Sequence, residues 1–279
     1  MLIDAGYTIS LQCPAVTSMI VQLSVHPSRA GDLRSPDIVT TNPHVPTSAY
    51  LDYFGNRVTR LEAPPGLITF TNRFTIYDSG LPDEVPVEAP LWPITRLPDD
   101  TLAFLVSSRY CDSDNLSEFA WSMFGGLQTG FGRVKAICDY VHNHIRFDYM
   151  QARATRTASD GLREGVGVCR DFAHLAIALC RCMNIPARYC TGYLGDIGVP
   201  LDPEPMDFSA WFEAYLEGRW YTFDARHNHP RIGRIPMARG RDAADAALST
   251  AFGVATLARF EVVTVEQAET IPLPLAGQA

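Results

Sequence analysis

The segment GVGVCRDFAHL, residues 165–175, places one cysteine where a helix is expected to begin. Behind Cys169, apolar residues recur at the spacing of one helix face, at Phe172, Ala176, Leu179 and Met183. The free N–H groups and the positive dipole end of a helix favour an anion at its first turn. We therefore expect the Cys169 thiol to have a lowered pKa and to act as a nucleophile. The alternative is a buried structural cysteine.

The composition is that of a globular chain with a sizeable core. The 279 residues are 47% hydrophobic and 19% charged, which excludes a disordered protein. The net charge of −8 argues against a general nucleic-acid binder. The first residues have no basic region ahead of an apolar stretch, and no long apolar run occurs. We therefore expect no signal peptide, no membrane span and a cytoplasmic location.

The number and spacing of the cysteines also favour a cytoplasmic location. The seven cysteines are Cys13, Cys111, Cys138, Cys169, Cys180, Cys182 and Cys190. Their number is odd and no C-x-x-C pair occurs, which is typical of free thiols rather than of a disulfide framework or a zinc site. We expect neither a metal nor an organic cofactor.

The N-terminal part has the pattern of short strands. Tyr7–Leu11, Met19–Val25, Leu67–Thr71 and Arg73–Tyr77 are alternating or β-branched segments, and turn residues separate them. This pattern predicts a small β-sandwich. Five prolines between Pro82 and Pro98 predict a stiff, extended linker. We assign residues 1–85 to the sandwich, 86–100 to the linker and 101–279 to a second domain.

The second domain mixes helices and strands. The expected order is a helix over Leu116–Phe124, a helix over about 131–145, a polar loop over Gln151–Glu164, the cysteine helix, a strand over Ala187–Leu194, and a hairpin of Ala210–Leu216 and Arg219–Asp224. A last strand over Thr256–Val265 and a loose tail from Ile271 complete it. A cysteine at a helix start and a hairpin that ends in an aspartate could together provide nucleophilic catalysis.

Five pieces of this domain carry a resemblance to a known family. They are Gly167–Ala173, Ile185–Tyr189, Gly192–Tyr193, Ala210–Glu213 and Trp220–Asp224. In this order the sequence resembles the transglutaminase-like superfamily of papain-like thiol enzymes, in particular the bacterial transglutaminase-like cysteine proteases. The N-terminal part, with Asp52–Asn56, resembles the β-rich domain that often precedes them. The resemblance implies an α+β fold, with an N-terminal β-sandwich followed by a papain-like, transglutaminase-like catalytic domain.

The resemblance also implies an activity and two roles. The activity is thiol-dependent acyl transfer or amide hydrolysis on a protein or peptide, with an amine as acceptor in the transfer reaction. Cys169 corresponds to the nucleophile and Asp224 to the acid that orients the base. Ser209-Ala210-Trp211 stands where the family has His-Ala-Trp, and a serine hydroxyl is too weak a base to replace imidazole. Loss of a general base costs about 10²–10⁴-fold in rate.

Three interpretations of this departure remain open. A different histidine could serve as the base, with His227, three residues after Asp224, preferred over His174 on the cysteine helix. Alternatively, Cys169 could work with water or Asp224 alone. Finally, the domain could have lost catalysis and kept its cleft for peptide binding.

Four further residues are candidates for the substrate cleft. Trp211 shares a strand face with Ser209, and its alternative role is a core aromatic. Tyr149 precedes the cysteine loop, and Asp171 lies beside the thiol in sequence. Arg226 belongs to a cluster with Arg231 and Arg234 that could hold a substrate anion or form a solvated surface.

Overall fold

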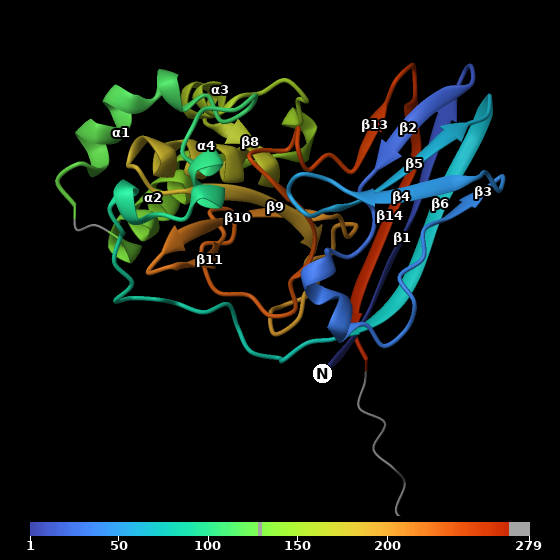
Figure 1. Ribbon diagram of the computed structural model, residues 1–279, viewed down its shortest axis with the longest axis horizontal. Helices are drawn as coiled ribbons and strands as arrows, with labels where there is room; N and C mark the ends of the chain where they lie inside the picture. Colours follow the sequence, from blue (N-terminus) through green and yellow to red (C-terminus); the bar gives the residue numbers. More distant parts are fainter. Residues whose placement is uncertain (128–129, 268–279) are drawn as a thin grey trace, which may run out of the picture.

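The computed structural model describes residues 1–127 and 130–267. A β-sandwich lies beside a unit in which helices cover one face of a sheet (Figure 1). The α+β fold class expected from the sequence is therefore confirmed.

The sandwich consists of two antiparallel four-stranded sheets. In order across the first sheet, the strands are β14 (Thr256–Glu266), β1 (Leu2–Cys13), β6 (Gly66–Tyr77) and β3 (Thr40–Asn42). The second has β13 (Ser249–Ala251), β2 (Thr17–Val21), β5 (Arg57–Ala63) and β4 (Thr47–Leu51). Apolar side chains from both inner faces, such as Tyr7, Met19 and Phe70, are fully buried between them.

The chain returns to the sandwich at its C-terminal end. Strand β14 pairs with β1 from Ile3↔Glu266 to Gln12↔Thr256, so that its red arrow lies beside dark blue β1 in Figure 1. The predicted boundary of 101–279 for the second domain is therefore wrong for residues 249–266. Local sequence could not show this, because the pairing joins segments that are about 250 residues apart. The predicted tail from Ile271 lies outside the described residues.

The second unit is built around helix α4. Its helices are α1 (Ser117–Phe124), α2 (Phe131–His144), α3 (Ala158–Glu164) and α4 (Cys169–Cys182). Its main sheet has the order β11 (Arg219–Phe223), β10 (Ser209–Leu216), β9 (Ala187–Tyr193) and β12 (Ile235–Gly240). Strands β7 (Arg146–Phe147) and β8 (Val166–Gly167) form a short parallel pair. Helix α4 is buried along most of its length because α1, α2 and α3 cover it on one side and β9 and β10 on the other.

Most elements of this unit follow the predictions, but α3, β12 and the short β7–β8 pair were not expected. The segment expected to be a loop before the cysteine contains α3, which Thr157 starts by accepting the N–H of Asp160 in a capping box. Strand β12 was not expected, and it pairs with β9 through a register shift next to Pro236.

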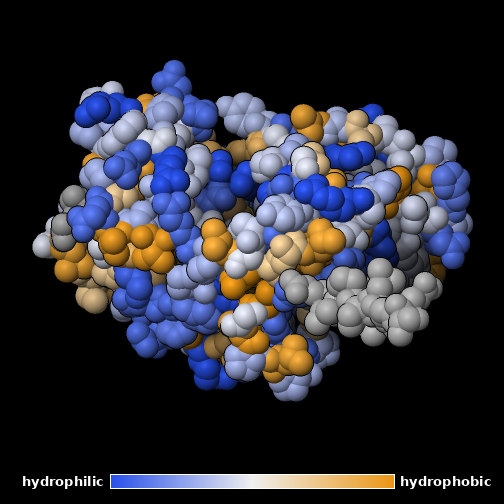
Figure 2. Space-filling view, turned by 90° about the horizontal axis from the view of Figure 1, so that it is seen from below, coloured by the Kyte–Doolittle hydropathy of each residue, from blue (hydrophilic) through white to orange (hydrophobic). Residues whose placement is uncertain are grey.

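The strap, residues 78–93, connects the sandwich to the second unit and runs along the lower edge in Figure 1 without helix or strand. Seen from below, this side of the molecule has several small apolar areas separated by hydrophilic side chains (Figure 2). Exposed strap residues include Leu81, Val85 and Val87. The proline-rich segment is therefore an ordered connection that contacts both parts of the molecule.

Candidate active site

Cys169 is the first residue of α4, as the sequence predicted. Strand β8 delivers it, because β8 pairs with β7 immediately before the helix. A Cβ atom on Gly167 would meet the Asp171 carboxylate at 2.6 Å, so only glycine fits this close approach. The β7–β8 pair and Gly167 therefore determine the position of the Cys169 thiol.

Asp171 holds the cysteine loop and does not line the cleft. Its Oδ2 accepts the N–H of Val168 at 2.9 Å and Nη1 of Arg156 at 3.0 Å. The side chains of Asp171 and Arg156 are both almost completely buried. The sequence-based placement of Asp171 beside the substrate is corrected, because the carboxylate turns back to cap its own helix.

The thiol of Cys169 is half-buried and does not have the acidity that we expected. Burial raises its pKa to about 11, and the nearby Asp207 carboxylate acts in the same direction. The Arg226 guanidinium and the N–H groups of Ala210 and Arg170 oppose this rise without overcoming it. The thiol is therefore protonated near neutral pH, so its activation requires a base.

Asp224 follows the last residue of β11 and binds a histidine. Nδ1 of His227 donates to Oδ2 of Asp224 at 2.9 Å, and the backbone N–H groups of Arg226 and His227 donate to Oδ1 at 3.0 Å. A carboxylate only accepts, so this contact puts the His227 proton on Nδ1 and leaves Nε2 as the acceptor. An aspartate that orients an imidazole in this way is the pairing used in acyl-transfer enzymes.

Arg234 is a cationic partner of the same carboxylate. Nη2 of Arg234 donates to Oδ2 of Asp224 at 2.9 Å. Burial alone would raise the pKa of Asp224, but the charge of Arg234 and the His227 hydrogen bonds hold it well below its usual range. Arg231 and Arg234 are both buried, which corrects their interpretation as a solvated surface cluster.

Ser209 opens β10 and is followed by Ala210, whose backbone N–H lowers the pKa of Cys169. The Ser209 side chain is 5% exposed, and its Oγ has no hydrogen-bond partner among residues 1–127 and 130–267. The family's histidine position is therefore occupied by a small side chain, whereas an imidazole reaches Asp224 from position 227.

A cleft of about 90 Å³ lies at this end of the sheet. Ser209, His227, Arg226 and Tyr149 line it, together with Asp207. Burial and the Asp207 charge raise the pKa of Tyr149, and Arg226 opposes them. Tyr149 and Arg226, which the sequence analysis proposed as substrate-cleft residues, both line this cavity. Asp207 was not predicted to line the cleft, although it lies only two residues before Ser209, in the segment that leads into β10.

Two other candidates lie elsewhere. Trp211 is buried, and the guanidinium carbon of Arg234 lies 5.0 Å from its ring, in a cavity of about 270 Å³ that also contains Glu213. It therefore supports Arg234 instead of walling the cleft. His174 is fully buried on α4, and its Nε2 accepts the N–H of Ala243 at 3.2 Å. This contact excludes His174 as the base.

Neither a metal-binding cluster nor a membrane-spanning helix occurs among the described residues. In residues 1–127 and 130–267, no cluster of three or more His, Cys, Asp or Glu side chains has an arrangement that could hold a metal. Within the same residues, no helix combines the length and the apolar character needed to cross a bilayer.

Comparison with known proteins identifies the family of this chain. The model of the transglutaminase-like superfamily matches residues 117–225. A candidate cysteine protease from Cytophaga hutchinsonii has a similar structure, with a TM-score of 0.82 and 32% identity over 95% of this chain and 90% of that one. An uncharacterized protein of Mycobacterium leprae is 26% identical over 75% of this chain and 77% of its own length. The human kyphoscoliosis peptidase is 29% identical over 43% of this chain, which spans 19% of that protein. The chain belongs to the transglutaminase-like superfamily.

Proposed function

We propose that the protein is a cysteine peptidase or amidase that forms an acyl-thioester on Cys169, with His227 as the base and Asp224 as its orienting acid. The observation that carries this proposal is the 2.9 Å contact between Nδ1 of His227 and Oδ2 of Asp224. This chain has a serine at position 209, where the family has its base. His227 and Asp224 together supply the base–acid pair that is therefore missing there.

The reaction would take place in two steps. In the first, Nε2 of His227 takes the thiol proton, sulfur bonds to the carbonyl carbon, and the C–N bond breaks as the amine leaves with that proton. In the second, water attacks the thioester while His227 takes its proton, and the carboxylic acid leaves with Cys169 restored. A primary amine in place of water gives a new amide. The N–H groups of Ala210 and Arg170 near the sulfur support stabilisation of the oxyanion.

A peptide library tests the activity and separates its two outcomes. The wild-type protein is incubated with peptides in the presence and absence of a biotinylated primary amine, beside Cys169→Ala. Cleavage or deamidation that disappears in Cys169→Ala supports hydrolysis, whereas incorporation of the amine into peptides supports acyl transfer. Equal product from the wild-type and variant proteins would contradict both.

One observation favours a second candidate, a peptide-binding module without catalysis. Burial raises the pKa of Cys169 to about 11, which slows any attack that lacks a base. Binding of library peptides by the wild-type protein without any turnover would support this alternative and contradict the enzyme.

A further inference from the structure

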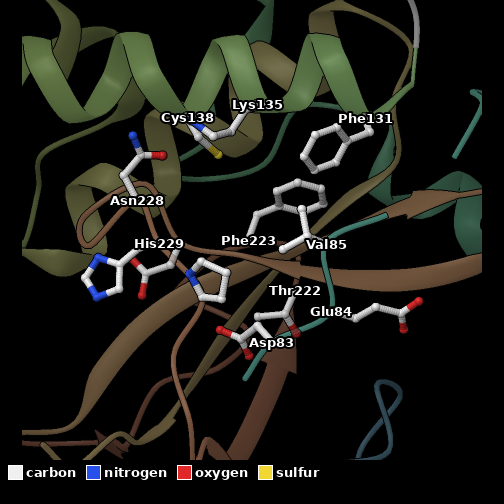
Figure 3. A pocket seen from close by; sticks show the side chains of 12 residues that line it. Asp83, Glu84, Val85, Phe131, Lys135, Cys138, Thr222, Phe223, Asn228 and His229 are labelled. Carbon is white, nitrogen blue, oxygen red and sulfur yellow. The ribbon is translucent and has the colours of Figure 1, made fainter. Parts of the chain in front are cut away.

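The strap contacts the catalytic sheet along strand β11. Its Pro90 carbonyl accepts the N–H of Glu217 at 3.0 Å, and Glu84 pairs with Arg219 at 2.5 Å. Figure 3 shows Asp83, Glu84 and Val85 beside Thr222 and Phe223, at the end of β11 that leads to Asp224. A segment outside the catalytic sheet therefore lines the same cavity as Asp224, the residue that orients the proposed base.

Asp83 is the strap residue that makes this connection. Its Oδ2 accepts the N–H of Arg231 at 2.9 Å and Nε of Arg234 at 2.8 Å, and its own N–H donates to the Arg231 carbonyl at 2.9 Å. The side chain of Asp83 is 16% exposed and that of Arg234 only 7%. A charge-assisted hydrogen bond in such surroundings is shielded from water and holds a defined geometry.

Arg234 passes this constraint to the proposed catalytic pair. Its Nε binds Asp83, while its Nη2 binds the same Oδ2 of Asp224 that accepts Nδ1 of His227. The Trp211 ring packs against the guanidinium group, and this contact restricts how far Arg234 can turn. A shift of Arg234 would therefore change the orientation of Asp224 and of the imidazole that depends on it.

We infer that Asp83 is a positioning residue, which acts through Arg234 and Asp224 to hold His227 in its working orientation. The inference rests on the proposed function of the Cys169 site. It means that the segment joining the two parts of the molecule completes the active site, so the second unit without its strap would be catalytically impaired.

The test compares Asp83→Asn with Glu84→Gln in the full chain. Asparagine keeps the size of the side chain but removes its charge, whereas Glu84 forms an exposed pair that contributes little. With p-nitrophenyl acetate as substrate, Asp83→Asn is expected to lower kcat by about tenfold or more with little change in KM, since misorientation of a reacting group is costly. Glu84→Gln is expected to stay within about twofold of the wild type.

A second readout separates positioning from general destabilisation. The proton that His227 shares with Asp224 gives a downfield NMR signal, which is assigned with His227→Gln. The account predicts that this signal shifts or broadens in Asp83→Asn at a temperature where thermal unfolding shows the variant to be folded. An unchanged kcat together with an unchanged signal would overturn the inference.

The controls distinguish a failure of the proposed function from a failure of the positioning role of Asp83. If the wild-type protein fails to turn over the ester, the proposed function is contradicted, while the NMR signal still decides the inference. If Asp83→Asn does not fold, Arg234→Lys tests the same link, because lysine keeps the charge but cannot bridge two carboxylates as a planar group. Wild-type kcat in Arg234→Lys would overturn the inference.

Discussion

Nδ1 of His227 lies 2.9 Å from Oδ2 of Asp224, which is three positions earlier in the chain. The same carboxylate accepts the backbone N–H of His227 at 3.0 Å through its other oxygen. Asp224 therefore holds both the backbone and the ring of His227, which makes the imidazole a fixed part of the turn after β11. An imidazole whose proton is held on one nitrogen has the other nitrogen free to accept a proton.

Replacing this histidine should remove most of the activity. We expect His227→Gln to lower turnover by about 10²–10⁴-fold, which is the usual cost of losing a general base. The matched control is His229→Gln, since His229 is exposed and contacts the His227 carbonyl through Nδ1. Steady-state hydrolysis of the best library peptide measures both variants. Loss of less than about threefold in His227→Gln would show that another group takes the proton.

A histidine placed at position 209 should rescue that variant. Ser209 is the residue before Ala210, whose backbone N–H lowers the pKa of Cys169, and within the described chain its Oγ has no hydrogen bond that an imidazole would break. We expect Ser209→His in the His227→Gln background to restore at least about tenfold of the lost rate. Because Ser209 is buried, the larger ring should cost about 1–3 kcal/mol of stability. A double variant that folds but remains as slow as His227→Gln would contradict the proposal that His227 replaces a base at position 209.

The thiol should show a high pKa in alkylation experiments. Burial raises the pKa of Cys169 to about 11, so the reactive thiolate is scarce at neutral pH and increases as pH rises. The rate of iodoacetamide modification at Cys169, with Cys169→Ala as the background, should therefore keep rising above pH 9. Arg226→Met should slow it further, because a cation that lowers this pKa is removed. A plateau below about pH 8 would contradict this description of the thiol.

Local pattern predicted the elements whose core contacts repeat regularly along the chain. The helical spacing of apolar residues found α2 and α4, and the Glu217–Gly218 turn between alternating strands found the β10–β11 hairpin. Helix α3 was missed because six of its seven residues are polar or small and because it depends on the Thr157 cap. Its short length leaves too few apolar positions for a periodic signal.

The parts of the site that the sequence could not predict depend on distant partners. Arg234 belongs to a run of basic residues that is usually solvated, and its contacts with Asp83, 151 residues away, and with Asp224 explain its burial. Trp211 follows Ser209 on the same strand face, but the Arg234 side chain determines what its ring contacts. The Asp224–His227 pair could be proposed because both residues lie in one turn, whereas its hydrogen bond needed the coordinates.

The buried pair beneath the cysteine loop should be important for stability. Arg156 and Asp171 are 3% and 1% exposed, so Arg156→Met would remove the hydrogen-bonded cation of a buried carboxylate and leave it only the more distant Arg170, at 3.7 Å. We expect a loss of about 3–5 kcal/mol in the free energy of unfolding. Arg163→Met removes an exposed ion pair on the neighbouring helix and should cost less than about 1 kcal/mol. Urea unfolding of the two variants checks this difference, and equal losses would show that the buried pair has no special role.

The mass of the intact protein during its reaction with p-nitrophenyl acetate shows whether an acyl-thioester forms on Cys169. The account predicts that the wild-type protein gains one acetyl group on Cys169 and then loses it to water, that Cys169→Ala gains none, and that His227→Gln gains and loses it slowly. A wild-type protein that stays unmodified, or that is acetylated to the same extent as Cys169→Ala, would contradict an acyl-thioester at Cys169.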